Sequence, residues 1–378
     1  MPGFELIGKE EKKQLSKLID DGGVLFAHGF EKKRKNFHIR EFEKQIAKKF
    51  KVKFCLAVSS GTAAIKIALK ALGVKPGDEV ITQAFNFIAT IEAILDCGAK
   101  PVVVNVNNTL NMDPNELKKK ITKKTKVIAP VHMLGVSCEM DEIFKIASKH
   151  KIPVLEDNCE SVGGKYKKKY LGTMAEAGIF SLDYGKFITT GEGGLILTND
   201  KKIIKYCREY HDHGHENNPK LPRGRDTKNI FGFNYRMTEM QGAIGKVQLK
   251  RVNYLLKENK SRYLSISKSL KNVVKIRSIP KFSIPNYDTF IFFEQDKIVR
   301  KKIINLLIKE EIGTKNLPDA IEWHCSFFWD QVFSKKERNK FLKTKNLLNT
   351  AIAIPIMLKH SPSKYKKISN EIKKIYEN

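Results

Sequence analysis

The sequence has no long hydrophobic run, and this absence limits the class of protein first. No apolar stretch reaches the roughly 18 residues that a helix needs to cross a bilayer. The opening residues, 1–6, do not form a charged leader followed by an apolar segment. We therefore expect a cytoplasmic protein that does not engage a membrane.

Cysteine is also scarce. Six cysteines are scattered along the 378 residues, and no two of them form a C-x-x-C pair. Zinc sites and disulfide frameworks depend on cysteines at short, regular spacings. We therefore expect reduced thiols and no bound metal.

Acidic residues are few relative to basic ones. Asp and Glu number 41 against 70 Lys and Arg, which gives a formal net charge of +29. Such an excess can indicate a nucleic-acid-binding regulator, which is kept as an alternative. The basic residues are spread along the chain, as at 118–120, 167–169 and 366–367, and no arm interleaves them with aromatic residues. This spread favours solvated helix faces over nucleic-acid binding, and a positive field would also attract an anionic small substrate.

Between residues 40 and 200 the sequence alternates strand-like and helix-like segments. Short, nearly all-apolar, β-branched runs are typical of buried strands, and they include Phe54–Val58, Pro101–Val106, Val127–Val131 and Pro153–Leu155. Amphipathic stretches typical of helices separate them. This alternation predicts an α/β fold in which helices cover both faces of a mostly parallel central sheet. Ligands of such sheets bind at the carboxyl ends of the strands.

The pattern changes after residue 245. A long charged helical stretch covers 248–270, and short strand-like runs and lysine-rich helices follow it. We therefore predict two domains, a large domain of residues 1–245 and a smaller C-terminal α+β domain of residues 246–378.

A small turn, Ser59–Thr62, lies between a predicted strand and a predicted helix. A glycine in such a turn lets backbone N–H groups approach an anion, and the helix start adds partial positive charge. The segment therefore predicts a phosphate cradle. An ordinary helix cap by Ser60 or Thr62 is the alternative.

Two acids, Glu156 and Asp157, end the strand-like run before Asn158. A carboxylate at the carboxyl end of a strand can hold the protonated ring nitrogen of a pyridine-type cofactor. A helix cap or a surface acid would give the same pattern.

Lys186 follows the predicted strand Ile179–Leu182 and precedes the glycine-rich segment Thr189–Gly194. A lysine in this setting can form a Schiff base with an aldehyde cofactor. Lysine is common in this chain, so the evidence lies in the flanking turn.

A fourth segment, 233–240, leads into a helix. Asn234 could donate to a phosphate, and Arg236 could bind a carboxylate. A helix entry capped by Asn234 or Thr238 is the alternative.

Together these segments resemble the DegT/StrS-like sugar aminotransferases, which are fold-type I enzymes that use pyridoxal 5′-phosphate (PLP). The matching segments run in family order from about Phe42 to Leu255, and they include Ser60–Ala64, Gly77–Ile81, Val131–His132, Glu156–Asp157, Thr190–Gly194 and Asn234–Arg236. The resemblance implies a PLP-dependent transferase with a ping-pong mechanism. It would move an amino group from L-glutamate to a keto- or aldehydo-sugar, with pyridoxamine 5′-phosphate as the alternate cofactor form.

The resemblance also implies roles for single residues. Lys186 matches the Schiff-base lysine, Asp157 the partner of the pyridine nitrogen, and Phe87 the aromatic residue that stacks on the ring. The residues that match the phosphate ligands are Gly61, Thr62 and Ser181. Asn234 matches a residue that reaches the phosphate of the neighbouring subunit, which implies a homodimer with shared active sites.

One cofactor-binding position departs from the family pattern. The family usually has Gln or His three residues after the aspartate, near the phenolic oxygen of the cofactor, and this chain has Glu160. An ionised carboxylate would repel a phenolate unless it is protonated or rotated away.

A narrower resemblance concerns the substrate. Segments 1–6, 210–216 and 323–324 resemble transaminases that aminate the 8-oxo form of an octulosonate sugar acid for a variant lipopolysaccharide. The candidate substrate contacts are His213, His215, Arg236, Trp323 and His324. A polar-loop role for His213 and His215 and a core role for Trp323 and His324 are the alternatives.

The nearest rival function is a PLP- or pyridoxamine-dependent sugar dehydratase on the same fold. Such enzymes typically replace the Schiff-base lysine by histidine, and the lysine at 186 argues against that function.

Overall fold

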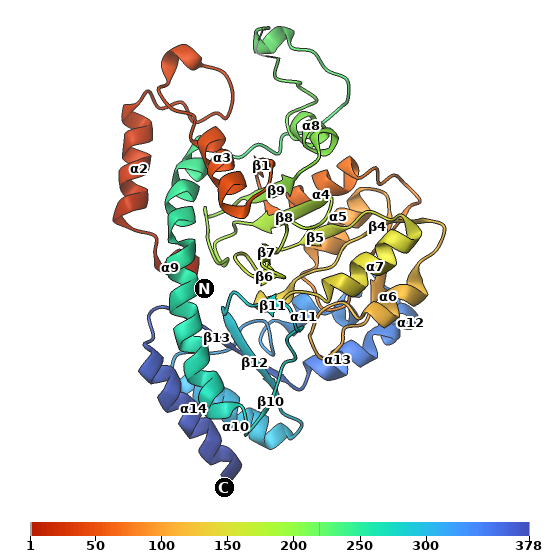
Figure 1. Ribbon diagram of the computed structural model, residues 1–378, viewed down its shortest axis with the longest axis vertical. Coiled ribbons are helices and arrows are strands. Elements are labelled where there is room, and N and C mark those ends of the chain that lie inside the picture. Colours follow the sequence, from red (N-terminus) through yellow and green to blue (C-terminus); the bar gives the residue numbers. More distant parts are fainter. Residues whose placement is uncertain (1, 219, 378) are drawn as a thin grey trace.

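The computed structural model describes residues 2–218 and 220–377 (Figure 1). A large α/β layer contains most of the chain up to about residue 238, and a smaller C-terminal unit, residues 271–377, lies below it in this view. The long helix α9 (Glu239–Leu270) runs beside both parts. The domain boundary predicted at residue 245 falls inside this helix.

The large layer is built on a central sheet whose strands fall into two hydrogen-bonded groups. These strands are β1 (Phe54–Val58), β2 (Glu79–Gln83), β3 (Lys100–Val104), β4 (Thr125–Ile128), β5 (Leu155–Asp157), β8 (Ala177–Ser181) and β9 (Gly194–Thr198). The group orders are β1-β9-β8-β5 and β3-β2-β4. Isolated parallel bridges, Ile128 with Val154 and Val131 with Asp157, join the two groups.

The strand directions confirm the predicted sheet. β5 and β8 are parallel, and so are β2 and its neighbours β3 and β4. Only β9 opposes the strands beside it, β1 and β8, among the described central strands. The sheet is therefore mostly parallel.

Helices cover both faces of this sheet. On β1, Leu56 and Val58 enter one hydrophobic core, whereas Cys55 and Ala57 enter another. Because side chains alternate along a strand, the two cores lie on opposite faces. The covering helices include α3 (His38–Phe50), α4 (Gly61–Ala71), α5 (Ala89–Asp96), α6 (Pro114–Lys120), α7 (Met140–His150) and α8 (Lys201–Tyr210).

Helix α9 packs closely on α3 through two glycines. A Cβ added at Gly245 would lie 2.6 Å from an atom of the Phe42 ring, and one at Gly242 would lie 2.7 Å from the Ile39 nitrogen. Glycine weakens a helix interior by about 0.5–1 kcal/mol relative to alanine. Here it permits the close packing that buries Phe42.

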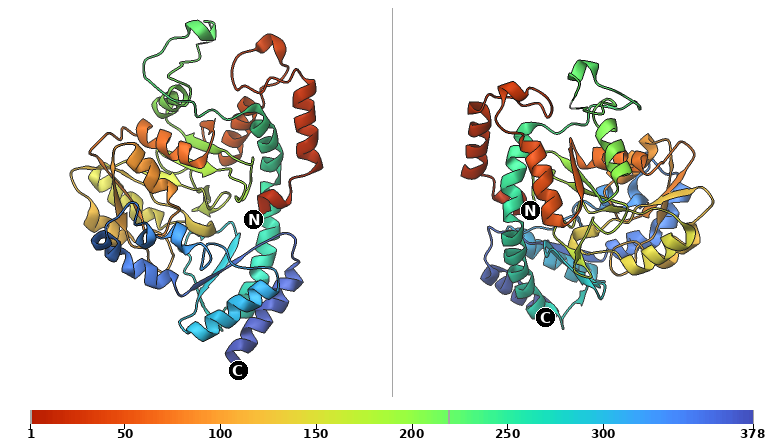
Figure 2. Two further views of the ribbon diagram at one scale, coloured as in Figure 1. Left: turned by 180° about the vertical axis from the view of Figure 1, so that it is seen from behind. Right: turned by 45° about the horizontal axis from the view of Figure 1, so that its top comes forward.

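The C-terminal unit contains a small antiparallel sheet of β10 (Lys275–Ile276), β12 (Thr289–Phe293) and β13 (Ala351–Pro355). Helices α10 (Lys297–Lys309) and α14 (Pro362–Glu377) share a core with it (Figure 2). The two parts also pair directly, because β11 (Ser283–Ile284) bonds β6 (Lys165–Tyr166), which pairs β7 (Lys169–Tyr170).

The remaining helices are α1 (Pro2–Glu5), α2 (Lys9–Asp20), α11 (Ile321–His324), α12 (Lys335–Arg338) and α13 (Leu342–Leu348). Within residues 2–218 and 220–377, no helix combines the length and the apolar character that crossing a bilayer requires.

Candidate active site

The candidate site lies at one edge of the central sheet. β5 and β8 end at this edge, and β9 begins there, with Gly194 opposite both Val58 and Ser181. The carboxyl ends of β1, β5 and β8 therefore meet in space although they are far apart in sequence. Asp157 is the last residue of β5, and Gly61 and Lys186 follow β1 and β8.

The first turn of α4 and the end of β8 form a set of hydrogen-bond donors. The Ser60 hydroxyl oxygen accepts a hydrogen bond from the Ala63 amide at 3.1 Å and caps the helix. The Gly61 and Thr62 amides belong to the first turn, where N–H groups have no partner within the helix. A Cβ on Gly61 would lie 2.9 Å from the Ser181 Cβ. Glycine thus lets the Ser181 hydroxyl lie against the helix start, and the arrangement suits a phosphate group.

Lys186 lies on the turn that follows β8. The Lys186 amide donates to the Asp183 carbonyl at 3.0 Å, and the Asp183 carboxylate accepts from the Gly185 amide at 3.0 Å. The Lys186 side chain is only 17% exposed, and its amine forms a short ion pair with Glu160. Burial opposes the charged form, but Glu160, together with Cys159 and Asp183, outweighs burial and raises the pKa of Lys186 above its usual value.

Asp157 is the last residue of β5, and its side chain is buried. One carboxylate oxygen accepts from the Cys159 amide at 3.1 Å, and the other accepts from the Thr90 hydroxyl at 3.0 Å. Burial raises the pKa of Asp157, although these two hydrogen bonds and the Lys186 charge oppose the shift. A buried carboxylate with two fixed oxygens is suited to hold a protonated ring nitrogen. Thr90, the second residue of α5, was not predicted from the sequence.

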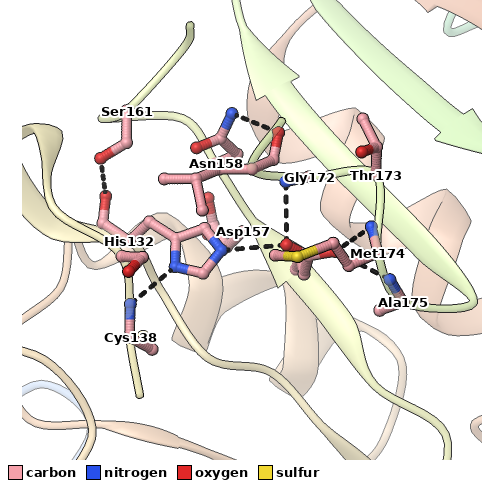
Figure 3. Close-up of polar contacts among 12 residues, drawn as sticks. His132, Cys138, Asp157, Asn158, Ser161, Gly172, Thr173, Met174 and Ala175 are labelled. Carbon is pink, nitrogen blue, oxygen red and sulfur yellow. Dashed lines mark hydrogen bonds and ion pairs between the residues drawn. The ribbon is translucent and has the colours of Figure 1, made fainter. Parts of the chain in front are cut away.

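Glu156, the neighbour of Asp157, belongs to a separate structural network, and Figure 3 shows its partners His132, Gly172, Met174 and Ala175. Its buried carboxylate accepts from the amides of Gly172, Met174 and Ala175 at 2.9, 2.6 and 2.8 Å. It also pairs with Nε2 of His132 at 3.1 Å.

The tautomer of His132 follows from its other partner. The Cys138 amide donates to Nδ1 at 3.1 Å, so the ring hydrogen is on Nε2 and is donated to Glu156. His132 therefore braces the strand end that carries Asp157.

The C-terminal unit contributes a buried lysine that the sequence analysis missed. Lys315 pairs with Asp288 at 2.8 Å and lies 3.6 Å from the second carboxylate oxygen of Glu160. Burial favours neutral Glu160, but Lys186 and Lys315 overcome it and lower the pKa of Glu160 to about 2. Glu160 is thus an ionised group between two lysines. In this lysine-rich chain nothing local in the sequence marks Lys315.

Three predicted residues lie together beside the site, the exposed Phe87 and Trp323 and the buried His324. Phe87 is 43% exposed, and its ring centroid lies 5.4 Å from that of His324. His324 lies close enough to Lys186 and Glu160 for their charges to act on it, and burial lowers the pKa of His324. Trp323, beside it on α11, is 60% exposed.

The other predicted residues lie in a second region. Arg236 donates to the buried Asp212 carboxylate at 2.7 Å, and Arg223 donates to the same group at 2.8 Å. His215 pairs with Asp226 at 3.2 Å, within the same long segment.

Asn234 and His213 belong to this second region as well, and both are exposed. Within one chain, these residues are not grouped with Lys186. They stay candidate substrate and phosphate contacts.

The first region fits PLP chemically. An amine, a buried carboxylate, an aromatic side chain and backbone donors at a helix start are the kinds of groups that can bind that cofactor, and at Gly61 a side chain would meet Ser181. Among the described residues, no group of three or more His, Cys, Asp and Glu side chains could hold a metal ion.

Comparison with known proteins identifies the family of this chain. Residues 27–373 match the model of the DegT/DnrJ/EryC1/StrS aminotransferase family. GDP-perosamine synthase of Escherichia coli O157:H7 is 32% identical over 82% of each chain, and that of Caulobacter vibrioides is 43% identical over 57% of each chain. The crystal structure of an aminotransferase from Psychrobacter cryohalolentis superposes with a TM-score of 0.83, at 26% identity over 98% of each chain.

The superposition confirms the predicted fold-type I α/β fold, and the family match covers both the central sheet and the C-terminal unit. The chain therefore belongs to the DegT/DnrJ/EryC1/StrS aminotransferase family and is a PLP-dependent sugar aminotransferase.

Proposed function

We propose that this enzyme transfers the amino group of L-glutamate to a keto- or aldehydo-sugar, with Lys186 as the residue that binds PLP covalently. The observation that carries the proposal is the enclosed Lys186 amine, which lies at the sheet edge with buried Asp157 and the Gly61–Ser181 phosphate cradle. PLP, when bound, supplies an electron sink, and it alternates between its pyridoxal and pyridoxamine forms.

The protein residues would divide the work as follows. Gly61, Thr62 and Ser181 would hold the phosphate, and Phe87 would lie against the ring. Asp157 would keep the ring nitrogen protonated, because an anion beside that nitrogen stabilises its charge. The Lys186 amine, once released by the donor, would carry a proton between the α-carbon of the donor and the C4′ carbon of the cofactor.

We propose that the sugar enters beside Phe87 and His324, since the exposed Phe87 ring lies against the buried His324 ring, on which the charges of Lys186 and Glu160 act. Two substrate classes compete, an octulosonate that carries an aldehyde at carbon 8 and a nucleotide-linked 4-keto-hexose. The first follows from the resemblance in segments 210–216 and 323–324, and the second from the likeness to GDP-perosamine synthases.

The test is a two-stage spectroscopic assay. Glutamate alone should remove the visible band of the lysine-bound cofactor and release 2-oxoglutarate, and the correct sugar should restore the band. The Lys186→Ala variant should show no such band and no turnover. A wild-type band that does not respond to any amino donor would reject the aminotransferase proposal.

We further propose that the enzyme is a homodimer whose segment 212–236 completes the partner's site. The described residues of this segment, 212–218 and 220–236, project from the body of the molecule in Figure 1, and Phe231 and Phe233 among them are 73% and 43% exposed. Exposed aromatic clusters of this kind mark association surfaces. In this arrangement Asn234 would reach the other subunit's phosphate, and His213, His215 and Arg236 would approach its sugar.

Subunit mixing tests the shared site. Lys186→Ala lacks the cofactor amine, and Asn234→Ala lacks the contributed contact, so each homodimer should have little activity. A mixed dimer has one intact site, and co-refolding the two variants should therefore restore activity. No recovery in a mixture proven by mass to contain heterodimers would refute the shared site.

A further inference from the structure

Three buried charges, Asp288, Lys315 and Glu160, link the C-terminal unit to the half-buried amine of Lys186. Asp288 pairs with Lys315 at 2.8 Å, Lys315 lies 3.6 Å from Glu160, and Glu160 forms a short ion pair with Lys186. The Lys315, Glu160 and Asp288 side chains are all less than one tenth exposed. From Asp288 to Lys186 the charges of this row alternate: anion, cation, anion, cation.

Glu160 lies between the two lysines of this row of charges. Its Oε1 faces Lys186, and its Oε2 faces Lys315 without a hydrogen bond in the described structure. A buried carboxylate stays ionised only when cations or donors compensate it. The two lysines supply that compensation from opposite sides.

Lys315 is fixed by its own surroundings. Its amide donates to the Ala353 carbonyl on β13 at 2.9 Å, and its amine is held by Asp288, which immediately precedes β12. The position of the charge beside Glu160 is therefore set by the sheet of the C-terminal unit.

We propose that Glu160 is a catalytic counter-ion of the Lys186 amine and that Lys315 is the positioning residue that holds Glu160 for this task. The inference rests on the proposed covalent role of Lys186. In this arrangement the carboxylate at position 160 serves the lysine nitrogen, and it does not serve the cofactor's phenolic oxygen, which the family's Gln or His approaches.

In the reaction, Glu160 makes the Lys186 amine a stronger base. An anion beside a nitrogen stabilises its protonated form, so Nζ of Lys186 takes up a proton more readily. The other titratable groups close to Lys186 or Glu160 are Cys159, Asp183, Asp157 and His324. Cys159 and His324 are not carboxylates. Asp157 accepts hydrogen bonds from Thr90 and the Cys159 amide, and Asp183 accepts one from the Gly185 amide. Glu160 is therefore the carboxylate that pairs with the Lys186 amine.

The pH titration of the visible band of cofactor-loaded enzyme tests this proposal. Glu160→Gln keeps the shape and removes the anion, so the midpoint should fall by about one pH unit or more. Lys315→Met removes a cation that partly offsets the charge of Glu160. The lysine nitrogen should then hold its proton more strongly, and the midpoint should rise. A merely structural role would not move the two midpoints in opposite directions. Lys315→Arg keeps the charge and should leave the midpoint near the wild-type value.

A second measurement needs no cofactor. In cofactor-free protein at pH 8, an amine-reactive reagent should label Lys186 several-fold faster in Glu160→Gln than in wild type, because more of the amine is neutral. Lys201, which is exposed on α8, serves as the internal control and should be labelled equally in both.

The two measurements separate the possible failures. An unchanged or higher midpoint in Glu160→Gln, together with unchanged labelling, would overturn the counter-ion role. Faster labelling in a protein that shows no lysine-bound cofactor would instead support the ion pair and reject the proposed function.

Discussion

Replacing Glu156 by glutamine should destabilise the large domain strongly although the two side chains have nearly the same shape. Each oxygen of this buried carboxylate accepts two hydrogen bonds. The amide of glutamine keeps one accepting oxygen, and its NH₂ group would face two N–H donors. A buried donor left without a partner costs about 1–3 kcal/mol, so the expected loss is about 2–6 kcal/mol of unfolding free energy.

Urea denaturation followed by far-ultraviolet circular dichroism measures this loss. The matched control is Glu142→Gln, an exposed glutamate on α7, which should change stability by less than about 0.5 kcal/mol. A Glu156→Gln protein within about 1 kcal/mol of wild type would refute the reasoning that this carboxylate holds the strand end.

Two further predictions concern the site. Ser181→Ala should weaken PLP retention at least about tenfold with little change in fold, because one donor to a charged phosphate is lost; equilibrium dialysis measures it, and unchanged affinity would remove Ser181 from the cradle. The pKa of Glu160 in the folded, cofactor-free protein lies at about 2, below its usual 4.5, so its ionised form contributes stability above about pH 4.5 that is lost as the pH falls toward 2. Unfolding curves between pH 5 and pH 3 should therefore decline more steeply for wild type than for Glu160→Gln, and parallel declines would contradict this assignment.

Apolar pattern predicted much of the large domain. The strand expected at Phe54–Val58 coincides with β1, but the strand expected at Pro153–Leu155 overlaps β5 only at Leu155, because β5 runs from Leu155 to Asp157. The apolar pattern predicted that the strand ends at Leu155, before the two acidic residues. The strand extends through them because Glu156 finds internal donors and the Asp157 amide bonds the Pro130 carbonyl at 3.0 Å.

Helix α9 shows a second limit of local pattern. The sequence indicated a helix over 248–270, and the structure begins it at Glu239. Gly242 and Gly245 lower helix propensity in this stretch. These glycines permit close packing against Ile39 and Phe42, a tertiary contact that local sequence pattern does not indicate.

The same distinction applies to the site. The strand-end motifs predicted that Gly61, Asp157, Ser181 and Lys186 lie close together, because such motifs converge at one edge of a parallel sheet. Thr90 and Lys315 reach the site from a helix and from the C-terminal unit, and no spacing in the sequence links them to it.

Locating the covalently held cofactor tests the central claim most directly. Borohydride reduction of cofactor-loaded enzyme, followed by proteolysis and mass spectrometry, should place one pyridoxyl-phosphate group on the peptide that contains Lys186. A group found on Lys315 or on a surface lysine, with the Lys186 peptide unmodified, would contradict the account.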